Sequence, residues 1–102
     1  MTESQLCMQK LYEHFMEELS DAEEYFHLAC EHKRKKPALA KVFAQLGDDE
    51  LKHAGMLEKE VLNIVTTAGE GDTNESVIHV FMKKPIADSW MRAKAAKSHY
   101  EN

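Results

Sequence analysis

A long stretch without glycine or proline constrains the fold of this chain most. Among 102 residues there are only four glycines and two prolines, and residues 4–32 contain neither. That stretch is rich in Glu, Leu, Met, Ala and Lys, which are good helix formers. This composition excludes a disordered linker, a collagen-like chain and a turn-rich β sandwich. The length predicts a single domain over residues 1–102, with a core so modest that self-association would add stability.

The first helix is expected over residues 4–32 and the second over residues 38–66. Between them lie four consecutive cations, Lys33 to Lys36, followed by Pro37. Cations suit the carboxyl end of a helix and proline suits the first turn of the next one, so this segment predicts a tight helix–helix connection.

Breaker residues after the second helix predict a loop over residues 67–74. The remaining segment, residues 75–100, is helical by composition but contains Pro85. Because proline removes a backbone hydrogen bond, we expect this C-terminal helical segment to be broken near Pro85.

The charge and the termini narrow the class of protein further. Thirteen basic and eighteen acidic residues give a net charge of -5, which argues against nucleic-acid binding. No apolar run approaches the roughly 20 residues of a membrane span, and the first ten residues lack the order of a secretion signal. Cys7 and Cys30 form no Cys-x-x-Cys pair, which favours reduced thiols. We therefore expect a cytoplasmic protein that binds neither nucleic acid nor membranes.

Both long helices carry ionisable residues where the helical period calls for apolar ones. Glu18, flanked by His14 and Asp21, lies in an apolar stripe of the first helix that comprises Cys7, Leu11, Phe15, Ala22, Tyr25, Phe26 and Ala29. Glu50 and His53 lie in the stripe of the second helix, which comprises Leu39, Ala40, Phe43, Leu46, Gly47, Ala54, Leu57, Val61 and Ile64. A carboxylate on a buried face is costly unless it is paired, hydrogen-bonded or bound to a metal.

A metal site explains these positions best. Glu50 and His53 are three residues apart, so both project from one helix face within a turn. Together with a Glu from a neighbouring helix, Glu-x-x-His is the ligand pattern of carboxylate-bridged dinuclear iron or manganese sites in helical bundles. The alternative is a buried Glu–His pair that only fixes the helix register. The position of these residues within two facing apolar stripes favours the metal site.

The sequence resembles the ferritin-like superfamily, and most of all rubrerythrins and short encapsulated ferritins, over residues 17–29, 37–43 and 49–57. The resemblance implies that Glu18, Glu50 and His53 are metal ligands. It also places Tyr25, seven residues after Glu18, close to the metals, with core packing as the alternative.

His14 and Asp21 lie about one turn from Glu18 on either side. They are candidates for supporting the ligands or lining an entry route, and surface contacts are the alternative.

The resemblance implies an all-α fold, with a ferritin-like antiparallel helical hairpin followed by the C-terminal helical segment. A complete rubrerythrin bundle has four helices and two Glu-x-x-His halves, whereas this chain has one such half. We therefore expect dimerisation, as a homodimer or a higher even oligomer, to complete a four-helix bundle. Two Fe ions would lie at each dimer interface, and Mn or Zn are alternatives.

The implied function is iron binding with oxidation of Fe(II) by oxygen or peroxide. No catalytic residue is expected beyond the metal ligands. The Cys-x-x-Cys pairs of a rubredoxin-like module are missing, so an internal electron relay is not expected. A protein cage or an external electron donor stays open as a partner. Two alternatives are a metal-binding or sensing module without turnover and a structural helical adaptor.

Overall fold

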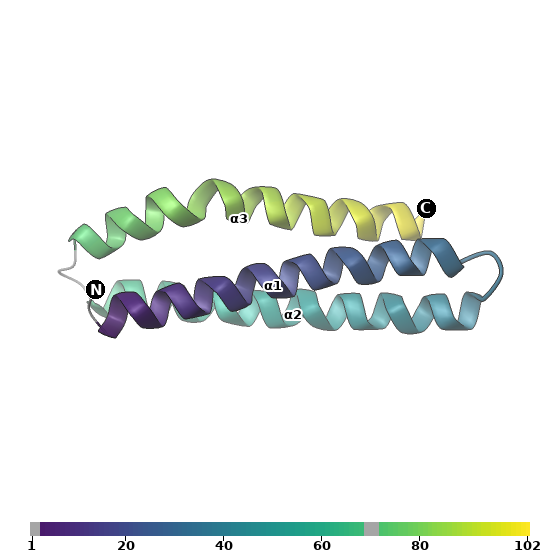
Figure 1. Ribbon diagram of the computed structural model, residues 1–102, viewed down its shortest axis with the longest axis horizontal. Helices are drawn as coiled ribbons and strands as arrows, with labels where there is room; N and C mark the ends of the chain where they lie inside the picture. The colour runs from purple at the N-terminus through teal and green to yellow at the C-terminus, as the bar shows by residue number, and fades with distance from the viewer. Residues whose placement is uncertain (1–2, 69–71) are drawn as a thin grey trace.

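The computed structural model describes the backbone of residues 3–68 and 72–102, with the side chains of 4–5, 62, 64–68 and 72–84 left out. Over these ranges the chain forms three helices and no strand: α1 (Glu3–His32), α2 (Pro37–Ala68) and α3 (Asp72–Glu101). They form a rod of 54 × 19 × 18 Å (Figure 1). Helix α1 packs closely on α2 and also on α3, whereas α2 and α3 touch each other much less. The predicted all-α fold with a helical hairpin is confirmed.

The hairpin turns where the cations and Pro37 predicted a connection. Pro37 is the first residue of α2, and the backbone amide of Lys36 donates a hydrogen bond to the carbonyl of His32 over 2.8 Å. The Lys33 ammonium donates to the carbonyl of Tyr100, so the last turn of α3 is held at the same end of the rod. The carboxyl ends of α1 and α3 therefore both meet the basic turn, where cations compensate their exposed carbonyls.

The break expected near Pro85 is not present, because α3 is one helix with Pro85 inside it. Proline costs one backbone hydrogen bond and pushes on the preceding turn, which bends a helix without having to end it. Figure 1 accordingly shows α3 as a bowed ribbon without interruption. The expected loop over residues 67–74 is also shorter, since α2 extends to Ala68 and α3 begins at Asp72. Asp is a favoured residue at a helix start as well as in a turn.

The core lies where α1 is enclosed by its two neighbours. Its buried members come from all three helices: Phe15, Leu19, Ala22, Phe26, Ala54, Ala93 and Ala96. Leu19, only 1% exposed, is absent from the predicted stripe, because that stripe allowed for one packed face whereas α1 has two. Three stripe members, Cys7, Leu39 and Leu46, are instead exposed.

Two polar contacts fasten α3 to α2 beyond the small core side chains. The indole Nε1 of Trp90 donates a hydrogen bond to Glu58 over 3.0 Å, and its ring meets Phe15 edge-on at 5.9 Å. Closer to the turn, Lys97 forms an ion pair of 2.8 Å with Asp48, which raises the pKa of Lys97. These contacts fasten the described part of α3, whose buried apolar core residues are Ala93 and Ala96, to the hairpin.

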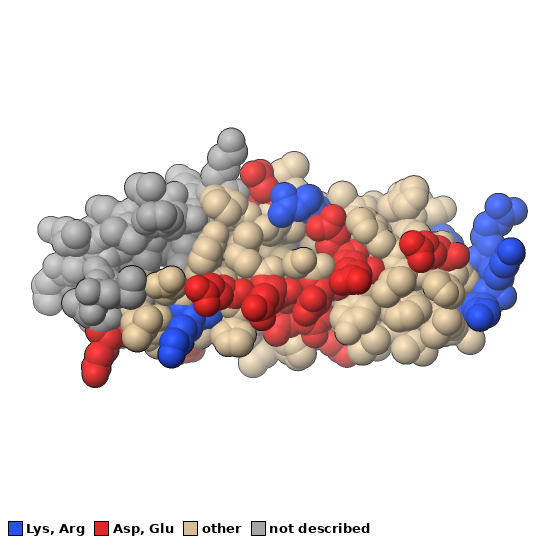
Figure 2. All heavy atoms as spheres, in the orientation of Figure 1, with Lys and Arg blue, Asp and Glu red and all other residues tan. Residues whose placement is uncertain are grey.

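Charge is unevenly distributed over the rod. Figure 2 shows a band of acidic side chains over the middle of α1 and a group of basic side chains at the end that carries the α1–α2 turn. Among the described helices, none is long and apolar enough to cross a membrane.

The close approach of α1 and α2 depends on Gly47. A Cβ atom added there would lie 2.8 Å from the ring of Phe26, which is 1% exposed and cannot move away. We expect Gly47→Ala to lower the free energy of unfolding by about 1–3 kcal/mol, because the helices must separate to admit the methyl group. Urea unfolding in the presence of a chelator measures this.

Gly55 is the matched control, since an added Cβ meets nothing within 4 Å. Gly55→Ala should raise the free energy of unfolding by about 0.5–1 kcal/mol through helix propensity alone. Equal effects of the two substitutions would contradict the packing argument.

Candidate metal centre

The hairpin brings Glu18 level with the Glu-x-x-His segment. Glu18 lies fourteen residues before the end of α1, and Glu50 lies thirteen residues after the start of α2. In an antiparallel pair of helices joined by a short turn, residues equally far from the turn lie side by side. His53 follows Glu50 by one turn and therefore projects from the same face.

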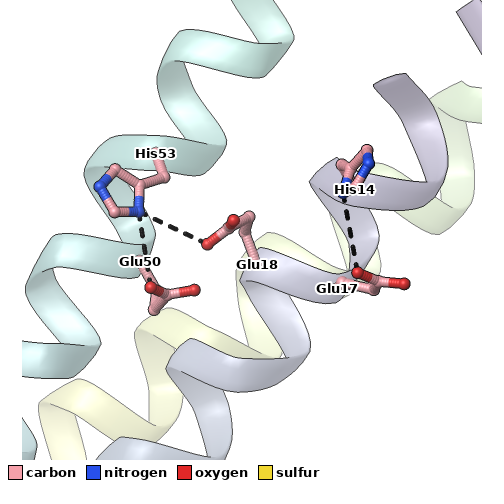
Figure 3. Close-up of polar contacts among 5 residues, drawn as sticks. All are labelled: His14, Glu17, Glu18, Glu50 and His53. Atoms are coloured by element: carbon pink, nitrogen blue, oxygen red, sulfur yellow. Dashed lines mark ion pairs between the residues drawn. The ribbon is translucent and has the colours of Figure 1, made fainter. Parts of the chain in front are cut away.

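The three side chains converge between the two helices (Figure 3). The His53 Nδ1 atom lies 3.6 Å from Glu18 Oε2 and 3.5 Å from Glu50 Oε1. One ligand atom from each residue falls within 4.8 Å of the others. Among the described residues, this is the one group of three or more His, Cys, Asp or Glu side chains with such spacing, and it is the group predicted from the sequence.

The group sits at the edge of the hairpin and not inside it. Glu18 and Glu50 are 25% and 19% exposed, whereas His53 is 54% exposed. The Oε2 atom of Glu18 is nevertheless buried and has no hydrogen-bond donor among the described residues. A buried carboxylate oxygen without a donor is costly, and a bound cation would remove that cost.

The donor set fits a divalent transition ion. With metal–ligand bonds of about 2.0–2.2 Å, two ligands of one ion lie roughly 3–3.5 Å apart. The distances from His53 to the two carboxylates are close to this spacing before any ion is bound. Hard carboxylate oxygens with one imidazole nitrogen suit iron and manganese, and they also accept zinc.

The three neighbours expected around the ligands differ in position. His14 lies one turn along α1 from Glu18 and pairs with Glu17 instead, with its Nδ1 atom 3.8 Å from Glu17 Oε2, apart from the converging three (Figure 3). Tyr25 lies about 10 Å along α1 from Glu18, and its ring stacks on Phe43 at 6.4 Å, so within one chain it packs in the hairpin. The exposed carboxylate of Asp21 remains close enough for its charge to act on Glu50.

The comparisons with known proteins agree with this geometry. The family model described as Rubrerythrin matches residues 10–89, which include most of α1, all of α2 and all three converging residues. The chain belongs to the Rubrerythrin family. Comparison with curated proteins and with solved structures found no match. Rubrerythrins are ferritin-like proteins that generally bind iron, so the converging carboxylates and imidazole in this rubrerythrin form a candidate iron site.

Without a metal, the carboxyl group of Glu50 keeps its proton to a higher pH than an ordinary glutamate. A hydrogen bond with Glu18, burial and the charge of Glu18 together raise the pKa of Glu50 from 4.5 to about 7, and Asp21 adds to the shift while His53 opposes it. Near neutral pH, Glu50 is therefore partly protonated, because the hydrogen bond with Glu18, burial and the charge of Glu18 all favour its neutral form. A cation bound there takes the place of this proton.

This shift gives the metal-free rubrerythrin a defined dependence on pH. Because the folded state holds the Glu50 proton more tightly than the unfolded state, the stability from this group is complete below pH 4.5 and lost as the pH rises through about 7. We expect the free energy of unfolding in chelator to fall between about pH 5.5 and pH 8, and to fall less in Glu50→Gln. Urea unfolding across this range checks it.

Other titrating groups also change the free energy of unfolding of the wild-type chain with pH. The quantity to compare is therefore the difference in this free energy between the wild-type chain and Glu50→Gln at each pH. A difference that does not change over this range would show that Glu50 titrates normally.

Proposed function

We propose that this chain binds iron at a dinuclear site shared by two copies and oxidises Fe(II) there with oxygen or peroxide. The observation that carries the proposal is the convergence of Glu18, Glu50 and His53 around a buried carboxylate oxygen for which the described part of the chain offers no hydrogen-bond donor. Membership of the Rubrerythrin family supports iron as the metal. The two-copy site and the oxidation are the parts that experiments must test.

The number of ligands supports a shared site. One chain supplies three ligand residues, which is too few to hold two ions in a carboxylate-bridged site. A second copy related by a twofold axis doubles the set to four carboxylates and two imidazoles. His53 supports the same arrangement, because a ligand that is 54% exposed leaves room for a partner on its open side.

The surface around His53 supports a second copy as that partner. Leu39, Val42, Leu46 and Met56 are between 36% and 69% exposed. At about 100° per residue they fall on one side of α2, and His53 lies in the middle of them. We call these five residues the α2 stripe. Exposed apolar side chains aligned over several turns of one helix are typical of a surface that is covered by a partner.

Each residue has a defined task in the proposed reaction. The carboxylates of Glu18 and Glu50 would hold the ions and offset their charge, and we favour Glu50 as the bridge. His53 would supply one nitrogen per ion. Two Fe(II) ions would each give up one electron, and the two electrons would reduce oxygen to peroxide or peroxide to water, with no nucleophile from this chain. As metal binds, the proton held between Glu50 and Glu18 leaves to solvent, so affinity rises with pH through about 7.

The cellular setting is part of the same proposal. The two free thiols, Cys7 and Cys30, fit the reducing cytoplasm expected from the sequence. Iron oxidation by oxygen or peroxide needs no internal electron relay, so an external electron donor or an enclosing protein cage is compatible with the site but not required.

Substitution of the ligands tests the metal site. Glu50→Ala and His53→Ala should each lower bound iron per chain and the rate of Fe(II) oxidation at least roughly tenfold, because one ligand is lost from each half of the site. Elemental analysis and stopped-flow absorbance of the ferric product measure the two quantities.

His14 and Glu17 offer a matched control, since they are also an exposed His and Glu three residues apart, and they pair with each other and not with the three ligands. Their alanine variants should keep both iron and rate. Bound iron without oxidation would favour the metal-binding or sensing module. Unchanged iron content in the ligand variants would contradict the metal site and favour a structural helical adaptor.

The α2 stripe gives a separate test of the shared site. Val42 is 54% exposed and makes little contact within its own chain. Val42→Glu should therefore leave the unfolding of a single chain nearly unchanged while it converts dimers to monomers and lowers iron per chain. Sedimentation velocity and elemental analysis report these changes.

Met91 on α3 is the control, because it is 67% exposed and lies away from the α2 stripe. Met91→Glu adds the same charge and should affect neither association nor iron. Full iron loading in a monomeric Val42→Glu protein would refute a site that needs two copies.

A further inference from the structure

A second surface of the molecule is a groove between α1 and α3. Its volume is about 460 Å³, and it is lined by Glu13, Met16, Glu17, Glu23 and Arg92 among others. Met16 and Glu18 are two residues apart on α1, so they point about 200° away from each other. The groove is therefore on the opposite side of α1 from the candidate iron site.

The groove combines an apolar floor with an acidic rim. Met16 and the buried Leu19 line its floor, where the Met16 sulfur lies 3.6 Å from the hydroxyl of Ser89. On the rim, Arg92 lies 3.5 Å from Glu23 and offsets that charge. The carboxylates of Glu13 and Glu17 have no Lys or Arg partner among the described ion pairs.

The basic turn, residues 33–36, has the complementary properties. All four side chains are exposed at the end of the rod (Figure 2). Lys33 is held by the carbonyl and the ring of Tyr100. No ion pair of the described residues involves Arg34, Lys35 or Lys36. Long cationic side chains place their aliphatic stems on apolar surface and their charged heads on carboxylates, which is what the groove offers.

We infer that the basic turn of one copy docks in the α1–α3 groove of another copy. Arg34 and Lys35 would meet Glu13 and Glu17, while their stems cover Met16. The contact is between two different surfaces, so it can link a chain to neighbours beyond the one across the α2 stripe. It does not involve Glu18, Glu50 or His53 and does not depend on the proposed iron chemistry.

Sedimentation velocity in chelator tests this contact apart from metal-linked association. Lowering the salt from about 1 M to about 0.01 M lengthens electrostatic screening from roughly 3 Å to 30 Å. The wild-type chain should form assemblies at low salt that dissociate at high salt. Reversing the turn (Arg34→Glu with Lys35→Glu) or the groove (Glu13→Lys with Glu17→Lys) should weaken association at least roughly tenfold.

Mixing the turn variant with the groove variant is the strongest test. The acidic turn of one then faces the basic groove of the other, and association should return. Lys52→Glu with Lys59→Glu adds the same negative charge as the turn variant on an exposed part of α2 and should leave association unchanged. Melting followed by circular dichroism checks that each variant folds. If the turn variant with two Glu substitutions does not fold, Arg34→Gln with Lys35→Gln is used in its place. The inference is overturned if the wild-type chain shows no salt-dependent assembly, if the mixture fails to associate, or if the control weakens assembly equally.

Discussion

The repulsion between the carboxyl groups of Glu18 and Glu50 is the constraint on which the candidate site depends. The hairpin holds them on facing helices with His53 about 3.5 Å from each. A hydrogen bond with Glu18, burial and the charge of Glu18 raise the pKa of Glu50, so Glu50 retains a proton towards neutral pH when no metal is bound. The Oε2 atom of Glu18 is buried and has no hydrogen-bond donor among the described residues, and a cation bound there would satisfy it.

Packing elsewhere on the same helices determines how closely α1 and α2 approach each other near these residues. Gly47 lets the ring of Phe26 rest directly on α2, and this close contact lies between the turn and the site. Helix α3 adds buried alanines to the core, and its Trp90 and Lys97 side chains contact Glu58 and Asp48 of α2. Helix α1 therefore packs against both neighbours. The backbone from which Glu18 projects is thus positioned by contacts that involve no ligand.

The hairpin and its three converging residues could be predicted because both depend on local rules. Helix formers, a cationic turn and Pro37 determine where α1 ends and α2 begins, and the equal distances from the turn then bring Glu18 to Glu50. The path of α3 could not be predicted in the same way. The sequence does not show whether α3 continues through Pro85, and the burial of Leu19 depends on where α3 packs. Tyr25 shares the ligand stripe, and its packing on Phe43 depends on how α1 and α2 face each other.

The helical periodicity of α2, which predicted the site, also shows which side of the site is exposed in one chain. The periodicity of α2 places Leu39, Leu46 and His53 on one face, yet a single chain leaves all three exposed. A sequence pattern records the buried faces of the functional assembly, so an apolar face that remains open in one chain indicates a missing neighbour. If that neighbour is a second copy, four carboxylates with charge -4 surround two divalent ions with charge +4, and the imidazoles stay neutral. The same two glutamates that repel each other in one chain would then be balanced in the pair.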